Sequence, residues 1–172
     1  MATAQLTADN DSIVAEVFVA ALPPRVFAAI TDPAQTAQWW GQKGMYRITE
    51  SKGDIRPGGK WSTSGVGDDG TEFTVEGEYL EIDPPRLLVH TWNPSFSNLR
   101  DTVVRWELEA HDVHGLHLQG PHRVGTGTLV KIRHSGFGGN LEQCKSHGDG
   151  WVRVLGWMKA FVEEGTTVDT RN

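Results

Sequence analysis

The 172-residue sequence predicts an α+β fold in which helices pack against one curved antiparallel sheet. Three observations support this prediction. An early strand is followed by two short helices, the middle of the chain repeats short strands separated by turns, and the end carries one long amphipathic helix. A single long helix laid across a curved sheet tends to leave a cavity in which a small ligand could lie.

The first strand and the two short helices are predicted near the N-terminus. The stretch "SIVAEVFVAA" starts at Ser12 and alternates its side chains between two faces, as a strand does. The double proline Pro23–Pro24 suits the first turn of a helix, where a missing N–H costs no hydrogen bond. The second helix is predicted over Pro33–Trp40, with Asp32 as its N-cap and Gly41 at its C-terminal end.

Two adjacent tryptophans close the second helix. Neighbouring residues on a helix point about 100° apart, so Trp39 and Trp40 cannot serve the same face. Trp40 is in helical register with Pro33 and Ala37 on the apolar side. We therefore predict that Trp40 belongs to the core and that Trp39 lies at the rim of the cavity.

Residues 45–135 are predicted to contain a meander of five or six antiparallel strands. Segments such as "TEFTVEGEYLEI" and "RLLVHTW" alternate large and polar side chains, and turn sequences such as "RPGG" and "DPP" separate the strands. The alternation places one set of large side chains on the face that the helices would cover: Trp61, Phe73, Tyr79, Leu88, His90, Trp92, Trp106, Ile132 and His134.

The last predicted element is an amphipathic helix that ends near Glu164. Its start could lie as early as Leu141, although Gly148 and Gly150 weaken that extension. The apolar stripe recurs at i, i+3, i+4, i+7 and i+11, on Trp151, Val154, Leu155, Met158 and Val162.

One domain is expected. Hydrophobic residues make up 38% of the chain, which at this length is enough to bury a core without disulfides or metal. The expected organisation is a flexible N-terminal lead-in over residues 1–11, a single domain over residues 12–165 and a flexible C-terminal tail over residues 166–172.

Composition argues against several classes of function. A net charge of −6 provides no basic surface for nucleic acid, and no apolar run is long enough to insert into a membrane. Cys144 is the single cysteine, so no internal disulfide can form. The polar N-terminus shows no signal peptide. These features together predict a cytoplasmic location.

The chain carries, in this order, the segments "LPPRVFAAITDPAQTAQWWG", "RPGGKWS", "VEGEYLEIDPPRLLVHTW", "GTLVKIRHSGF" and "DGWVRVLGWMKAFVE". Their order and spacing resemble the activator of Hsp-ninety ATPase homologue family over about residues 13 to 164. That family belongs to the START-like superfamily, also called SRPBCC or birch-pollen-allergen-like. The resemblance therefore implies a helix-grip fold, with the long C-terminal helix packed across an internal cavity.

The resemblance favours one function and leaves two alternatives open. START-like cavities often bind apolar or aromatic molecules, which favours non-catalytic binding of such a ligand between the sheet and the C-terminal helix. The alternatives are a co-chaperone-like module that interacts with a chaperone, and a cavity enzyme that acts on a hydrophobic ligand. The candidate ligand contacts are Trp39, Trp61, Phe73, Tyr79, His90, Trp92, Trp106, His134, Phe137 and Trp151.

His90 and His134 face the apolar side of their strands, and their role depends on what surrounds them. Either could contact a ligand or act as an acid or base, and either could be a buried ring that backbone groups satisfy. Cys144 and His147 lie one helical turn apart, but no third group that would orient them is apparent. We assign no catalytic residue and no cofactor.

The sequence departs from the family where Ala110 should meet Gly127 in a tight turn. An insertion there carries four histidines, His111, His114, His117 and His122. A zinc site would need three or four converging ligands, and this spacing suits neither one face of a strand nor a helix that contains Gly115. The favoured interpretation is a protruding polar hairpin without metal. The hairpin or an exposed strand could also pair in a homodimer.

Overall fold

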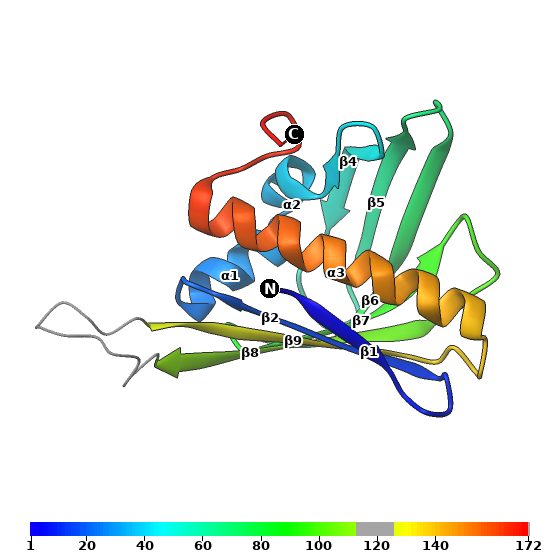
Figure 1. Cartoon of the computed structure of the whole chain (residues 1–172), viewed down its shortest axis with the longest axis horizontal. Helices are drawn as coiled ribbons and strands as arrows, with labels where there is room; N and C mark the ends of the chain where they lie inside the picture. The colour runs from blue at the N-terminus through cyan, green and yellow to red at the C-terminus, as the bar shows by residue number, and fades with distance from the viewer. Residues whose placement is uncertain (113–125, 172) are drawn as a thin grey trace, which may run out of the picture.

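The computed structural model of the chain describes residues 1–112 and 126–171. This part forms one antiparallel sheet of nine strands in the order β1-β2-β9-β8-β7-β6-β5-β4-β3, together with three helices (Figure 1). The strands are β1 (Thr3–Leu6), β2 (Ser12–Val19), β3 (Gly41–Gln42), β4 (Tyr46–Gly53), β5 (Lys60–Gly67), β6 (Glu72–Asp83), β7 (Leu87–Pro94), β8 (Thr102–Asp112) and β9 (Thr126–Ser135). The helices are α1 (Pro23–Thr31), α2 (Pro33–Trp39) and α3 (Leu141–Glu164).

The predicted α+β helix-grip architecture is confirmed. The sheet curls around α3, with β1, β2 and β9 on one side of the helix and β4 to β6 on the other (Figure 1). The side chain of Asn140 caps the start of α3, and Gly165 ends it in the left-handed conformation that glycine adopts without strain. No helix of the described ranges is long and apolar enough to cross a membrane.

The N-terminal lead-in is more ordered than expected. Residues 3–6 form β1, which pairs with β2 from Thr3 opposite Glu16 to Leu6 opposite Ile13. Leu6 also packs against α3, where a Cβ added at Gly148 would lie 3.3 Å from its Cδ1 atom. This partner is 142 positions away in the sequence, and the polar composition of the lead-in therefore concealed its role.

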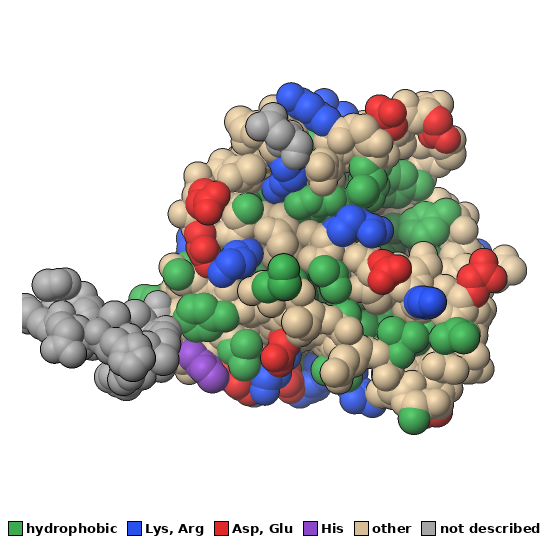
Figure 2. Space-filling model, viewed as in Figure 1, with side chains coloured by type: hydrophobic (Ala, Val, Ile, Leu, Met, Phe, Trp, Pro, Cys, Tyr) green, Lys and Arg blue, Asp and Glu red, His purple; other side chains and the backbone are tan. Residues whose placement is uncertain are grey.

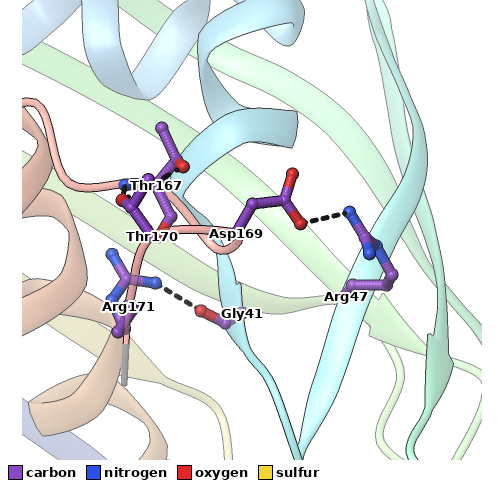
Figure 3. Close-up of polar contacts among 6 residues, drawn as sticks. All are labelled: Gly41, Arg47, Thr167, Asp169, Thr170 and Arg171. Carbon is purple, nitrogen blue, oxygen red and sulfur yellow. Dashed lines mark hydrogen bonds and ion pairs between the residues drawn. The ribbon is translucent and has the colours of Figure 1, made fainter.

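The C-terminal tail is held against the domain instead of being free (Figure 3). The guanidinium of Arg171 is buried, and it donates to the carbonyl oxygen of Trp39 at 3.0 Å and to that of Gly41. Its other terminal nitrogen donates to the carbonyl of Trp157, and its carbon lies 5.4 Å from the centre of the Trp157 ring. These bonds join the tail to the end of α2 and to α3.

Two more contacts fix the tail on the same corner. The amide of Val168 donates to the carbonyl of Gln38 at 2.9 Å, and Asp169 forms an ion pair with Arg47 of β4 at 3.1 Å (Figure 3). Val168 itself is buried. The expectation of a flexible tail rested on composition, which does not reveal that a carbonyl at the end of a helix, such as that of Trp39, will accept from a residue of the tail.

The assignment of the two tryptophans is reversed. Trp39 is fully buried and its indole N–H donates to the carbonyl of Ala29 at 2.9 Å, whereas Trp40 is half-buried. The reason is that α2 ends at Trp39, one residue earlier than predicted. Trp40 has extended backbone angles, φ −84° and ψ 108°, so its direction does not follow the helical phase of Pro33. The predicted N-cap is confirmed, because the Asp32 side chain accepts from the amide of Ala34.

Candidate functional site

A cavity of about 440 Å³ lies between α3 and the concave face of the sheet. Its walls come from α1, α2, the strands β4 to β8 and α3, and most of the side chains are apolar or aromatic. Pockets that hold drug-sized molecules usually have volumes of about 300 to 1,000 Å³, and this cavity lies within that range. Exposed lining residues mark the mouth: Met45, Lys52, Thr71, Phe96, Ser146 and Arg153. Figure 2 shows hydrophobic and cationic side chains gathered where α3 faces β4 and β5.

The structure brings seven of the ten predicted contact residues to this cavity. They are Trp61, Phe73, Tyr79, His90, Trp92, Trp106 and Trp151. The other three lie outside its lining. Trp39 is buried against α1. His134 lies behind the rings of Trp92 and Trp151: the centre of its imidazole is 5.7 Å from that of the Trp92 ring and 5.9 Å from that of the Trp151 ring. Phe137 packs on His134 at 4.7 Å.

Several lining residues were missed by the sequence reasoning. Trp40 lies in the wall, where its ring is 6.4 Å from that of Trp92 and 6.2 Å from that of Trp151. His147 was not proposed as a ligand contact because Gly148 and Gly150 weakened the extension of the helix back to Leu141, so the apolar stripe was counted only from Trp151. With the start at Leu141, its position four residues before Trp151 would have placed it on the apolar stripe. Tyr46, Phe96 and Arg153 also line the cavity.

Three buried imidazoles each accept a hydrogen bond from a tryptophan indole. The pairs are Trp106 to His90 at 3.2 Å, Trp151 to His134 at 3.0 Å, and Trp92 to His147 at 3.3 Å. A nitrogen that accepts carries no proton, so the proton of each neutral ring lies on its other nitrogen. The hydrogen-bond network thus fixes the tautomer of all three histidines.

The second nitrogen of each imidazole is also occupied. Nδ1 of His90 donates to the carbonyl of Thr91 at 3.0 Å, and Nδ1 of His147 donates to the carbonyl of Gln143 at 2.9 Å. Nε2 of His134 donates to the hydroxyl of Thr102 at 2.8 Å. No nitrogen of these rings is left to take a proton from a ligand.

Burial keeps the three imidazoles uncharged. It lowers the pKa of His90 to about 4, and it lowers the pKa of His147. The pKa of His134 falls well below its ordinary value, first because of burial and then because positive charge on His147 or His90 would repel its own. At neutral pH the three imidazoles, two in the cavity wall and one behind it, are therefore polar but uncharged.

Cys144 does not form a reactive pair with His147. Burial raises the pKa of the Cys144 thiol, helped by the negative charges of Asp11 and Asp9, so the thiol stays protonated. Its sulfur lies 3.7 Å from the carbonyl oxygen of Ser12, whereas both nitrogens of His147 have other partners. The cysteine is a buried packing residue of α3.

Hydroxyl and indole groups supply the remaining polar atoms of the wall. The Tyr46 hydroxyl accepts from the indole of Trp40 at 3.1 Å and keeps its own proton to donate. Burial raises the pKa of Tyr46, and it raises that of Tyr79 to about 12. The indole nitrogen of Trp61 is buried above Gly77 and has no hydrogen-bond partner among the described residues. All three groups are donors at neutral pH.

The histidine-rich insertion is tested at one position. His111 is exposed at the end of β8, and its Nε2 lies 3.6 Å from Glu109. His114, His117 and His122 lie outside the described residues, so the hairpin and the zinc interpretation both stay predictions. Within residues 1–112 and 126–171, no three His, Cys, Asp or Glu side chains converge as a metal site would require.

Comparison with known proteins places this geometry in context. A family model described as "Activator of Hsp90 ATPase homolog 1-like protein" matches residues 20–119. No curated protein sequence matches the chain.

Solved structures share the fold. A protein from Rhodobacter sphaeroides is 17% identical with a TM-score of 0.75, and the match covers 94% of this chain and 97% of that one. An AHSA1-like protein from Aeromonas hydrophila is 20% identical, with a TM-score of 0.68 and coverage of 88% and 91%. DynU16, a protein in the dynemicin biosynthetic locus, is 20% identical, with a TM-score of 0.66 and coverage of 94% and 50%. At these identities the similarity shows the fold alone.

Proposed function

The chain belongs to the Activator of Hsp90 ATPase homolog 1-like family, and we propose that its cavity binds a small apolar or aromatic molecule without converting it. One observation carries this proposal. A cavity of about 440 Å³ is walled by aromatic rings, while both nitrogens of each imidazole in its wall, His90 and His147, are already hydrogen-bonded. Such a wall offers surface for binding and no free base for chemistry.

The arrangement of the rings favours a flat ligand. Trp40 and Trp92 lie nearly parallel, with ring centres 6.4 Å apart and an angle of 24° between planes, and Trp151 meets Trp92 at a tilt. Phe73 and Tyr46 add an edge-to-face pair near the mouth. Flat apolar molecules gain both buried area and favourable ring contacts against walls of this kind. One structural neighbour comes from a biosynthetic locus, which supports a role with a small molecule.

Titration with N-phenyl-1-naphthylamine, a neutral dye that fluoresces in apolar surroundings, tests the proposal. We expect saturable binding, a rise in melting temperature and a change in tryptophan fluorescence. Thr63→Phe should abolish binding because Thr63 lines the cavity. Ser62→Phe is the matched control, since the neighbouring residue of β5 points to the other face of the sheet. No saturable binding by a folded wild-type protein would refute the proposal.

The two alternatives predict different results. A cavity enzyme would need one imidazole to exchange its indole or carbonyl partner for a ligand and then act on that ligand as an acid or base. Mass spectrometry of the recovered ligand would then show a converted product. A co-chaperone-like module would change the ATPase rate of a chaperone, and filling the cavity by Thr63→Phe would leave that change intact. Ligand recovered unchanged and an unaltered ATPase rate would favour the binding function.

A further inference from the structure

The charges around the cavity have one sign. Two cationic side chains, Lys52 and Arg153, line it, and no aspartate or glutamate of the described residues does. The chain as a whole has 22 acidic residues and a net charge of −6, so this exclusion runs against its composition. The absence of carboxylates from the lining would bring no binding energy to a cavity whose ligands were all neutral and apolar.

Arg153 is the cation that remains available. The ammonium of Lys52 lies 2.6 Å from the carboxylate of Glu50 and is thereby paired. Arg153 is exposed on α3, one residue before the lining residue Val154, and no described carboxylate lies within ion-pair distance of it. Its guanidinium presents five N–H donors in a planar fork that fits an oxygen anion.

Tyr46 provides a neutral donor from the sheet. It lies at the start of β4 and lines the same cavity as Arg153. Burial raises the pKa of Tyr46, and the positive charge of Arg153 opposes this rise, as expected for two groups that line one cavity. The hydroxyl oxygen already accepts from Trp40, and its own proton is available to donate to an anion.

We propose that the bound molecule is an amphipathic anion whose carboxylate or sulfonate oxygens are held at the mouth by the guanidinium of Arg153 and the hydroxyl of Tyr46. This inference rests on the proposed function and names the chemical class of its ligand. The apolar body extends inward between Trp40, Trp92 and Trp151. The anion stays at the mouth because the deep imidazoles are neutral and have no donor left, and the Trp61 indole nitrogen is covered.

A pair of dyes that differ by one charged group tests this. N-phenyl-1-naphthylamine is neutral, and 8-anilinonaphthalene-1-sulfonate adds a sulfonate to the same rings. A partly exposed charge-assisted hydrogen bond should make the dissociation constant of the sulfonate about tenfold lower than that of the neutral dye. Arg153→Met should remove this preference, because it should weaken binding of the sulfonate about tenfold more than binding of the neutral dye. Tyr46→Phe should reduce the preference about threefold.

Lys145→Met is the matched control. Lys145 is exposed on the same helix but does not line the cavity, so its removal changes the net charge equally and should leave the preference intact. Equal affinities of the wild type for the two dyes, or equal losses in the Lys145 and Arg153 variants, would overturn the inference and leave the proposed function standing. Binding of neither dye would overturn both.

Discussion

Acidification should destabilise the protein through His90, and the size of the effect follows from its environment. The ordinary pKa of this imidazole is 6.5 and burial lowers it to about 4 in the folded protein. As the pH falls below 6.5, the unfolded chain takes up the proton first, so stability present above pH 6.5 is lost progressively down to about pH 4. A difference of about 2.5 pKa units corresponds to roughly 3 kcal/mol.

Urea unfolding at pH 7, 6, 5 and 4, followed by tryptophan fluorescence and circular dichroism, measures this loss. Carboxylates and the other histidines also contribute, so the His90 share is obtained by subtracting the same series for His90→Gln. The amide of glutamine can accept from Trp106 and donate to the Thr91 carbonyl without taking a proton in this range. The wild type should lose roughly 3 kcal/mol more than the variant between pH 7 and pH 4.

The comparison also defines what would refute the reasoning. If the two proteins lose stability in parallel from pH 7 to pH 4, His90 is not held neutral by burial. The tautomer assigned to its imidazole would then be wrong as well. A wild type that lost stability only below pH 4 would refute it as well, because the unfolded imidazole binds its proton well above that pH.

Three further tests, with five substitutions in all, examine particular contacts. Trp39→Ala should cost about 3–5 kcal/mol in urea unfolding, whereas Trp40→Ala should mainly weaken binding of the neutral dye; the opposite pattern would restore the original assignment. Gly77→Ala should cost about 1–3 kcal/mol, because the added Cβ would lie 2.2 Å from a carbonyl oxygen of β7. Gly156→Ala is its control: a Cβ added there meets no atom within 4 Å, so the melting temperature should not fall. Arg171→Met should cost about 1–3 kcal/mol, since it removes the buried donor to the Trp39 carbonyl at the end of α2. An unchanged unfolding midpoint would show that the tail is not held.

Most of the fold could be predicted because it depends on periodic patterns. Alternation along "TEFTVEGEYLEI" placed Phe73 and Tyr79 on the cavity face, where the structure has them. The 3.6-residue stripe from Trp151 to Met158 likewise located the helix that closes the cavity. In both cases the signal lies within a short stretch of sequence.

The failures concern residues whose environment is set by distant segments. The role of Leu6 depends on a glycine in α3, and that of Arg171 depends on carbonyl groups at the end of α2. Trp39 and Trp40 exchanged roles because one residue at a helix end leaves the helical phase, and helix ends are the least predictable part of a pattern. The indole partners of His90 and His134 could not be predicted either, because they come from other elements of the fold.

The three indole–imidazole bonds give the cavity its own spectroscopic labels. In a proton–nitrogen NMR spectrum, the side-chain N–H of Trp92, Trp106 and Trp151 each reports on one imidazole acceptor. The N–H of Trp61 lines the same cavity but has no acceptor in the described structure, so its resonance reports on ligand entry without reporting on an imidazole. A ligand that enters the cavity, or a proton that reaches one ring, would shift a separate resonance for each wall. Ligand binding and protonation can therefore be followed at each tryptophan–histidine pair without any added probe.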